Sequence, residues 1–452
     1  MKKEQQIELE ITDLNNLGCG VGRYEGQVVF VSGAVRGDLI EAKVIKVNKS
    51  YAVARLTRII TASPLRLDFD PCSAPLSCGG CVYRHVTYEE ELRLKREYVE
   101  NAFRKAGLGH VTVLPTRSAG KVYGYRNKAQ YPVSETKNGL RAGFFARKSH
   151  NMIPAEGCAI QNPAFAPIVD LVCRFGTAAG WSAYDENDGR GLLRHIYLRI
   201  GEMTGEIMLC LVINGDTLPR AEEFCAEIGK SFPQVVSLLL NKNKKNTNVV
   251  LGDEYVTLAG RAYIEDILCG LRFKISPDSF YQVNRDGAEL LYGLAKEYAS
   301  LCGGETLMDL YCGTGTIGLS MASGVSRLIG IEIVSAAVDC ARENAKRGGI
   351  ENAQFFAADA GDREVILSAA GGTRPDVVVI DPPRKGSTQA LAETLASLEI
   401  PRIVYVSCDP DTLARDCVWF SELGYEIGDV TPFDMFPRTG HVESVVCLKR
   451  KG

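Results

Sequence analysis

Apolar and polar positions alternate through the first 60 residues, and glycine-rich turns separate the runs. Four such runs lie at 7–14, 27–33, 38–47 and 51–60. A period of two residues predicts strands that bury one face, and several short strands in a row are typical of a small antiparallel barrel. We therefore expect a small OB-like β-barrel domain over residues 1–62.

The next region changes its pattern twice. Residues 87–108 carry apolar side chains such as Leu94 and Tyr98 at helical spacing, so we expect a helix docked on a neighbouring surface. The chain then continues as strand-like runs and turns, with one helical stretch near 218–230. This pattern predicts an α+β middle domain over residues 63–270.

Strand patterns alternate with helical patterns in the last part of the chain. The strand-like runs lie at 306–312, 327–334, 353–359, 375–382 and 402–408. Strands separated by helices favour a doubly wound, mostly parallel sheet. Two final runs, 426–437 and 441–450, flank a short turn and predict an antiparallel hairpin that closes the sheet. We expect an α/β domain over residues 271–452 and a multidomain α/β protein.

Composition narrows the class of protein. The 452 residues are 46% hydrophobic and 24% charged, as in ordinary soluble globular proteins, and no apolar segment approaches the length of a membrane span. We expect a cytoplasmic protein in which the fifteen cysteines are reduced, metal-bound or catalytic rather than paired in disulfides. A formal net charge of −3 gives no general attraction to nucleic acid, so a nucleic-acid site must depend on local basic patches.

A glycine-rich loop follows the first strand of the predicted parallel sheet. Its sequence DLYCGTGTIGL, at 309–319, places glycines at a tight turn before a helix. Glu332 ends the next strand, where its carboxylate can accept hydrogen bonds from ribose hydroxyls. This spacing fits NAD and S-adenosylmethionine equally. Asp309, ahead of the glycines, favours S-adenosylmethionine, which has no pyrophosphate.

Two further reactive groups belong at the same edge of the sheet. The run IDPPRKG, at 380–386, puts Asp381 and two prolines there, and Cys408 follows the next strand directly. A strand cysteine is most often a small packed hydrophobe. Ligands of open α/β sheets, however, bind outside the carboxyl ends of the strands, so this position favours a reactive thiol. A dehydrogenase has no evident use for this set of residues.

Three cysteines within ten residues form a second candidate site. Cys72, Cys78 and Cys81 surround two glycines that permit a tight fold around a metal, and the fourth ligand is either Cys158 or the nearby His85. Four thiolates suit zinc as well as an iron–sulfur cluster. The spacing alone does not separate the two.

Five motifs in order resemble one enzyme family. They are ISPDSFYQVN at 275–284, the glycine-rich loop, IDPPRKG, VSCDP at 406–410 and HVESV at 441–445. Together they resemble the S-adenosylmethionine-dependent RNA uracil-5-methyltransferases of ribosomal and transfer RNA, and the similarity covers nearly the whole chain. The resemblance implies that the N-terminal barrel is a TRAM domain, which binds RNA, and that the C-terminal domain is a Rossmann-like methyltransferase domain.

The resemblance also assigns roles to individual residues. It implies that Cys408 is the nucleophile and that Glu443 is the base. The implied cofactor-binding residues are Gln282, Tyr311, Glu332 and Asp381, with Thr316 and Asp359 nearby. Some family members carry a [4Fe–4S] cluster, and here its ligands would be Cys72, Cys78, Cys81 and Cys158.

The chemistry of uracil independently suits these two catalytic roles. Its C5 atom is too weak a nucleophile to attack a sulfonium methyl group, but a thiolate that adds to C6 moves electron density onto C5. After methyl transfer, a base must remove the C5 proton so that the thiol can leave. Cys408 and Glu443 match these two requirements.

RNA is the expected partner. Basic and aromatic residues gather at 121–131, 141–150 and 189–199, a mixture that suits phosphates and splayed bases. Because the ribosomal branch of the family combines the barrel with the cysteine cluster, the resemblance favours 23S rRNA over transfer RNA. The alternative enzyme is an iron–sulfur, NAD-linked oxidoreductase, and the non-catalytic alternative is an RNA-binding assembly factor with an inactive methyltransferase fold. We expect a monomer without an obligate protein partner and without membrane association.

Overall fold

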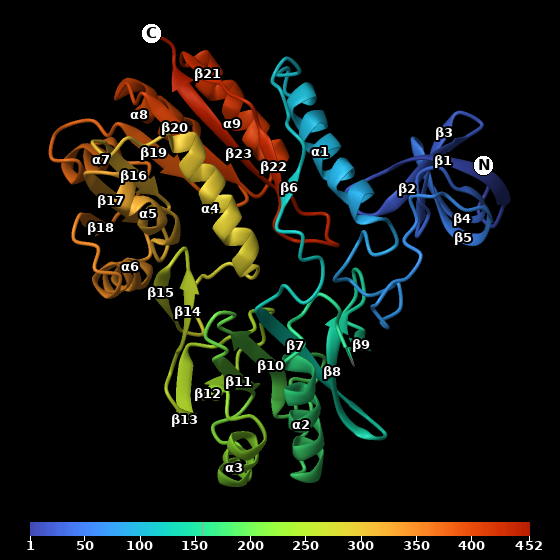
Figure 1. Ribbon diagram of the computed structural model, residues 1–452. Helices are drawn as coiled ribbons and strands as arrows, with labels where there is room; N and C mark the ends of the chain where they lie inside the picture. The colour runs from blue at the N-terminus through green and yellow to red at the C-terminus, as the bar shows by residue number, and fades with distance from the viewer. Residues whose placement is uncertain (156) are drawn as a thin grey trace.

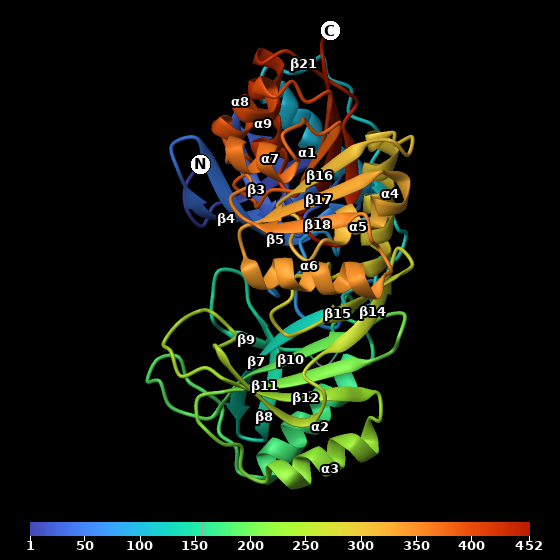
Figure 2. The same cartoon turned by 90° about the vertical axis from the view of Figure 1, so that its left-hand side faces the viewer.

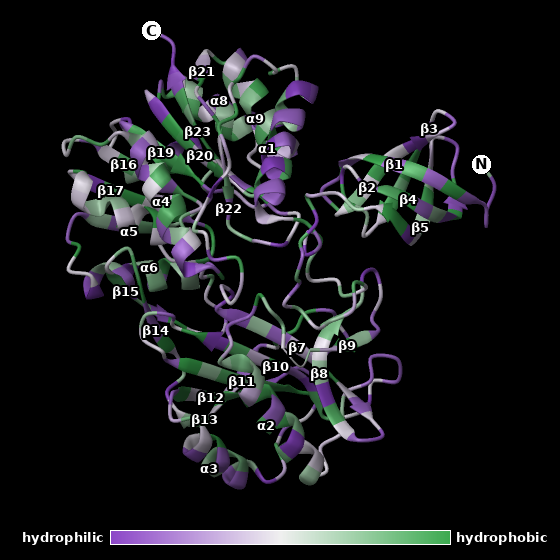
Figure 3. Ribbon diagram, turned by 45° about the vertical axis from the view of Figure 1, so that its right-hand side comes forward, coloured by the Kyte–Doolittle hydropathy of each residue, from purple (hydrophilic) through white to green (hydrophobic). Residues whose placement is uncertain are grey.

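A computed structural model describes residues 1–155 and 157–452. Figure 1 shows an N-terminal barrel to one side, a mixed sheet below, and a larger α/β sheet that contains the C-terminus. The strands of both sheets are mainly apolar, whereas polar residues line the outer faces of helices such as α1 (Tyr88–Lys105) (Figure 3). Within the described ranges, no helix is both long and apolar enough to cross a membrane.

The N-terminal strands close into the expected barrel, in the order β1-β2-β3-β5-β4. Ile7, Leu9 and Ile11 alternate with exposed residues and point into its core. One pair, β3 with β5, is parallel, so the expectation of a purely antiparallel barrel is wrong at that pair. The strands are β1 (Gln6–Leu14), β2 (Cys19–Tyr24), β3 (Gln27–Ser32), β4 (Leu39–Val47) and β5 (Tyr51–Thr61).

The helix α1 follows the barrel in sequence but packs on the C-terminal sheet. Thr87 caps it, and its last turn carries Arg104 and Lys105, as the helix dipole favours. Buried residues such as Phe103 join the core beneath α9 (Pro410–Glu422). The short strand β6 (Arg117–Ser118) then pairs with the edge of the C-terminal sheet, and Figure 1 shows α1 beside that sheet.

The middle of the chain forms a seven-stranded sheet in the order β13-β12-β11-β10-β7-β8-β9. The helices α2 (Phe165–Ala178) and α3 (Ala221–Ser231) cover one of its faces (Figure 2). The expected helix near 218–230 is α3, whereas the sequence pattern missed α2. The strands are β7 (Lys128–Thr136), β8 (Gly139–Phe145), β9 (Met152–Pro154), β10 (Leu193–Ile200), β11 (Ile207–Ile213), β12 (Val235–Lys242) and β13 (Glu254–Gly260). A hairpin of β14 (Ile264–Leu268) and β15 (Leu271–Ile275) leads from this sheet to the C-terminal one.

The C-terminal sheet has the order β18-β17-β16-β19-β20-β23-β22-β6, and β21 pairs with β23. Its parallel strands are β16 (Thr306–Leu310), β17 (Arg327–Glu332), β18 (Ala353–Ala357), β19 (Val377–Ile380) and β20 (Arg402–Ser407). The expected terminal hairpin is β22 (Thr431–Asp434) with β23 (Glu443–Arg450), and β21 (Tyr425–Ile427) lies beside it. The strand order reverses between β16 and β19, which opens a crevice at the carboxyl ends of the strands.

Helices cover both faces of this sheet, as in a doubly wound fold. One face packs against α4 (Arg285–Ala299), α5 (Thr316–Met321) and α6 (Ser335–Arg347). The other packs against α1, α7 (Arg363–Ala369), α8 (Gln389–Ser397) and α9. A short 3-10 helix, η1 (Ala322–Gly324), ends α5. Burial on both faces explains the near-continuous apolar runs of the parallel strands.

Candidate active site

The reactive side chains gather at one edge of the C-terminal sheet. Glu332, Asp381 and Cys408 come at or directly after the carboxyl ends of β17, β19 and β20, which are parallel strands. Glu443 begins β23, which runs antiparallel to β20, so its first residue lies at that same edge. The sheet topology thus brings together residues from four separate strands.

Cys408 and Glu443 face each other across two neighbouring strands. The last paired residues of β20 and β23 are Ser407 and Ser444, so one further step along the ladder brings Cys408 opposite Glu443. Residues opposite each other in an antiparallel pair have Cα atoms about 4.5 to 5.5 Å apart. Asp409 then caps α9 by accepting hydrogen bonds from the backbone amides of Asp411 and Thr412. This cap fixes the start of the helix directly after Cys408.

Burial, with repulsion between some of these groups, favours their neutral forms. Desolvation, followed by repulsion from Asp381, raises the pKa of Glu443 to about 8. Desolvation raises the pKa of Cys408 to about 11, and Glu443 and Asp381 add to the rise. Desolvation also raises the pKa of Asp381 to about 7. The site therefore favours the binding of a positive charge, which would stabilise the ionised carboxylates.

Arg384 is a member of this group that the sequence analysis did not single out. Its guanidinium lowers the pKa of both Cys408 and Glu443, against the larger effect of desolvation. The only signal in the sequence was the basic pair that follows the two prolines in IDPPRKG. Two residues on, a Cβ on Gly386 would lie 2.7 Å from the Asp416 carboxylate, so only glycine fits this turn.

The glycine-rich loop is built around a buried carboxylate. Asp309 accepts a hydrogen bond from the Gly318 amide at 2.9 Å, and a Cβ on Gly318 would lie 2.8 Å from the same carboxylate oxygen. Glycine at this position therefore lets α5 pack closely on β16. Burial raises the pKa of Asp309 to about 7. The hydroxyls of Thr316 and Tyr292, 3.1 Å apart, share a hydrogen bond inside this core.

The remaining predicted cofactor residues come from different segments and differ in burial. Glu332 accepts hydrogen bonds from the backbone amides of Gly313 and Val334, which ties its carboxylate to the glycine-rich loop. Tyr311 is half-buried and adopts a positive φ of 64° at the end of β16. Gln282 lies in the loop before α4, and Asp359 is exposed after β18.

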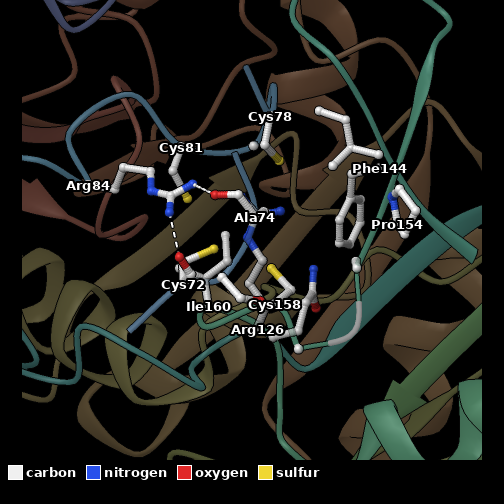
Figure 4. Close-up of a pocket in the computed structure, with 16 residues that line it drawn as sticks. Cys72, Ala74, Cys78, Cys81, Arg84, Arg126, Phe144, Pro154, Cys158 and Ile160 are labelled. Atoms are coloured by element: carbon white, nitrogen blue, oxygen red, sulfur yellow. Dashed lines mark hydrogen bonds between the residues drawn. The ribbon is translucent and has the colours of Figure 1, made fainter. Parts of the chain in front are cut away.

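The four predicted cluster cysteines line one cavity of about 90 Å³ (Figure 4). Burial raises the pKa of Cys81 to about 12, and the other three thiols add to this rise. His85, the alternative fourth ligand, is not among the residues that line the cavity. Among the described residues, no three potential ligands converge closely enough to hold a single metal ion. The described residues thus place four thiols at one cavity without forming a group that would hold a metal ion.

Part of the expected RNA-contacting surface lies inside the molecule. Arg194 and Arg199 are 4% and 1% exposed, respectively, and both donate hydrogen bonds to backbone carbonyls. The expectation that 189–199 uses these two side chains to grip phosphates is therefore wrong. Their guanidinium groups instead bind backbone carbonyls of neighbouring segments, such as those of Asn243 and Ser276.

Known proteins resemble both ends of the chain and its whole length. Residues 2–57 match the TRAM domain, and residues 233–451 match the tRNA (Uracil-5-)-methyltransferase family. An uncharacterized RNA methyltransferase of Halalkalibacterium halodurans is 41% identical, over 100% of this chain and 98% of that protein. Another from Clostridium acetobutylicum is also 41% identical, with the same two coverages. The crystal structure of Pyrococcus abyssi tRNA (uracil-54, C5)-methyltransferase in complex with S-adenosyl-L-homocysteine has a TM-score of 0.79 and 27% identity, covering 98% of this chain and 100% of that one.

Proposed function

The chain belongs to the RNA methyltransferases that join a TRAM domain to a tRNA (uracil-5-)-methyltransferase domain, and on this premise we propose that it methylates C5 of uridine in RNA, with Cys408 as nucleophile and Glu443 as base. The observation that carries the proposal is the strand register that brings the thiol opposite the carboxyl. One group must add to C6 and the other must take a proton from the adjacent C5, so they have to flank the same ring.

The residues would act in a fixed order. Cys408 adds as a thiolate to C6 of uracil, and the electrons of the C5–C6 double bond move toward C5 and O4. When bound, S-adenosylmethionine would supply the methyl group to C5, with the sulfur–methyl bond broken and S-adenosylhomocysteine released, and its positive charge would favour the ionised forms of Asp381, Glu443 and Cys408. Glu443 then removes the C5 proton, the double bond re-forms, and the bond between Cys408 and C6 breaks to release the thiolate.

Electrostatics favours S-adenosylmethionine over NAD in this crevice. Burial raises the pKa values of Asp309, Asp381 and Glu443, so each carboxylate would be stabilised by a nearby cation. A sulfonium group provides such a cation, whereas a pyrophosphate would repel the carboxylates. Glu332, Gln282, Tyr311 and Asp381 are the proposed cofactor-binding residues, with Thr316 and Asp359 close by.

We further propose that Cys72, Cys78, Cys81 and Cys158 hold a [4Fe–4S] cluster. The support for this proposal is that four thiols line one cavity, since a [4Fe–4S] cluster is held by four cysteine thiolates. Held in this way, the cluster would tie the loop after the barrel to the middle sheet. Its chemistry would be structural, because the reaction at Cys408 requires no electron transfer.

The proposed division of labour follows the three regions of the chain. Residues 1–62 would bind RNA as the TRAM barrel, residues 63–270 would carry the cluster and further RNA contacts, and residues 271–452 would catalyse methyl transfer. The protein would act as a monomer. We propose 23S rRNA as the substrate because the ribosomal branch that the sequence resembles combines the barrel with the cysteine cluster. Transfer RNA is the alternative, as the Pyrococcus abyssi protein acts on tRNA by its name.

Mass spectrometry of RNA nucleosides tests the proposed function. Ribosomal and transfer RNA from a strain that lacks the protein should be compared with RNA from the parent strain. We expect one or more 5-methyluridines to disappear from 23S rRNA and to return when the wild-type protein is restored. Loss from transfer RNA alone would reassign the substrate, and unchanged nucleosides in both RNAs would contradict the proposal.

A further inference from the structure

The middle sheet holds the segment that carries Gln282. Arg199 donates hydrogen bonds to the carbonyls of Ser276, at 3.0 Å, and Ser279, at 2.8 Å. On the same strand β10, the Tyr197 hydroxyl donates to the Pro277 carbonyl at 3.0 Å. Tyr197 and Arg199 are each 1% exposed. The bond from Tyr197 to Pro277 is fully buried, whereas the two bonds from Arg199 are partly buried.

Asn127 forms hydrogen bonds with the backbone of Gln282 and of the next residue. Its side-chain amide donates to the Gln282 carbonyl at 2.9 Å, and its backbone amide donates to the Val283 carbonyl at 2.8 Å. Asn127 is fully buried. The middle sheet thus fixes the backbone of this loop from its start to its end.

The segment that leads to Glu443 is held in a similar way. The carbonyl of Pro437 accepts a hydrogen bond from the Tyr125 hydroxyl at 3.0 Å, and Tyr125 has no exposed surface. Its neighbours are held from other directions: Asn284 donates to Met435, Lys95 to Phe436, and the amides of Val82 and Tyr83 to Arg438. Four consecutive carbonyls therefore have donors from four different parts of the chain.

We propose that Tyr125 and Tyr197 are positioning residues, through which the middle domain aligns the two halves of the active site. Tyr125 positions the segment that carries the base Glu443, and Tyr197 positions the segment that carries Gln282. The inference rests on the proposed function for the identity of these two groups. Its physical basis is that a lost hydroxyl leaves a buried carbonyl unpaired, so the segment shifts to find another donor.

Replacing each tyrosine with phenylalanine removes one hydroxyl and preserves the packing of the ring. Tyr425→Phe is the matched control, because this buried hydroxyl also donates to a backbone carbonyl, that of Ile400 at 2.9 Å, away from both segments. Three quantities should be measured on the full-length protein: the Kd for S-adenosylmethionine by calorimetry, the rate of methyl transfer to RNA, and the amount of covalent protein–RNA adduct on denaturing gels.

The two variants should fail in different ways. Tyr197→Phe should raise the Kd for S-adenosylmethionine about five- to tenfold without accumulating adduct. Tyr125→Phe should leave this Kd unchanged, slow turnover about five- to tenfold and accumulate an adduct that already carries the methyl group. Tyr425→Phe should match the wild type in all three measurements.

The same effect in both variants, or no effect in either, would overturn the inference. A uniform loss would indicate a general role in stability, and thermal unfolding of the three variants would show it directly. Failure of the proposed function is a separate result, because the wild-type protein itself would then methylate no uridine.

Discussion

Replacing Glu443 with glutamine should give the variant a free energy of unfolding that exceeds that of the wild type by more at high pH than at low pH. A carboxyl with a pKa of about 8 in the folded state and 4.5 in the unfolded chain keeps its proton up to a higher pH when the protein is folded. Its contribution to stability is full below pH 4.5, falls between pH 4.5 and 8, and is lost above 8. Between pH 6 and pH 9 this loss amounts to about 2 to 3 kcal/mol, from 1.4 kcal/mol for each pH unit up to 8. Glutamine cannot ionise, so the variant avoids the loss.

Urea unfolding of both proteins at pH 6 and pH 9 measures this effect. The advantage of Glu443→Gln over the wild type should be about 2 to 3 kcal/mol larger at pH 9 than at pH 6. Glu422→Gln, at the exposed end of α9, provides a control that should show no such pH dependence. An equal advantage at both pH values would refute the reasoning, because Glu443 would then ionise as readily in the folded as in the unfolded protein.

Three further predictions concern the cofactor, the cluster and the thiol. Glu332→Ala should weaken S-adenosylmethionine binding by about 1 to 3 kcal/mol in calorimetry, through loss of charge-assisted ribose hydrogen bonds, and tight NAD binding by the wild type would favour the oxidoreductase instead. Anaerobically purified protein should be brown and contain about four iron and four sulfide per chain, and Cys158→Ser should lower both contents, whereas stoichiometric zinc without iron would contradict the cluster. Alkylation of Cys408 by iodoacetamide, followed by peptide mass spectrometry without RNA or cofactor, should accelerate about tenfold per pH unit between pH 8 and 10, because the thiol pKa is about 11, and a rate that levels off below pH 9 would contradict this pKa.

Periodicity predicts the C-terminal sheet well for a physical reason. Parallel strands such as Val377–Ile380 are buried on both faces, so they appear in the sequence as short apolar runs between helices. The helix α2 was missed for a different reason. Its exposed residues, such as Asp170 and Arg174, recur at helical spacing, but its first turn has no capping side chain and no acidic residue, and its last turn has no basic residue.

Motif order predicts which residues belong to the sheet edge, but not how they interact. That Cys408, Asp381 and Glu443 lie at one edge follows from strands and topology that the pattern reveals. The proximity of Arg384 to Cys408 depends on the path of a turn, and the bond between Tyr125 and Pro437 joins residues 312 positions apart. The first contact depends on the conformation of one loop and the second on the docking of two domains, and no local sequence pattern encodes either.

The basic residues of the middle sheet illustrate the same limit. Arg199 lies in a segment whose composition suits RNA, but the strand turns its side chain toward the loop before Gln282. Its charge is satisfied by backbone carbonyls inside the protein. Burial of such a side chain is decided by a neighbouring domain, so composition alone assigns it wrongly.

The covalent adduct of Glu443→Gln tests the central claim most directly. This variant, incubated with substrate RNA and S-adenosylmethionine that carries a labelled methyl group, should give a slowly migrating protein–RNA species on a denaturing gel. That species should contain the label, because attack by Cys408 and methyl transfer precede the step that needs the base. It should be absent from the double variant Cys408→Ala, Glu443→Gln. Normal turnover by Glu443→Gln, or an adduct that persists without Cys408, would contradict the account.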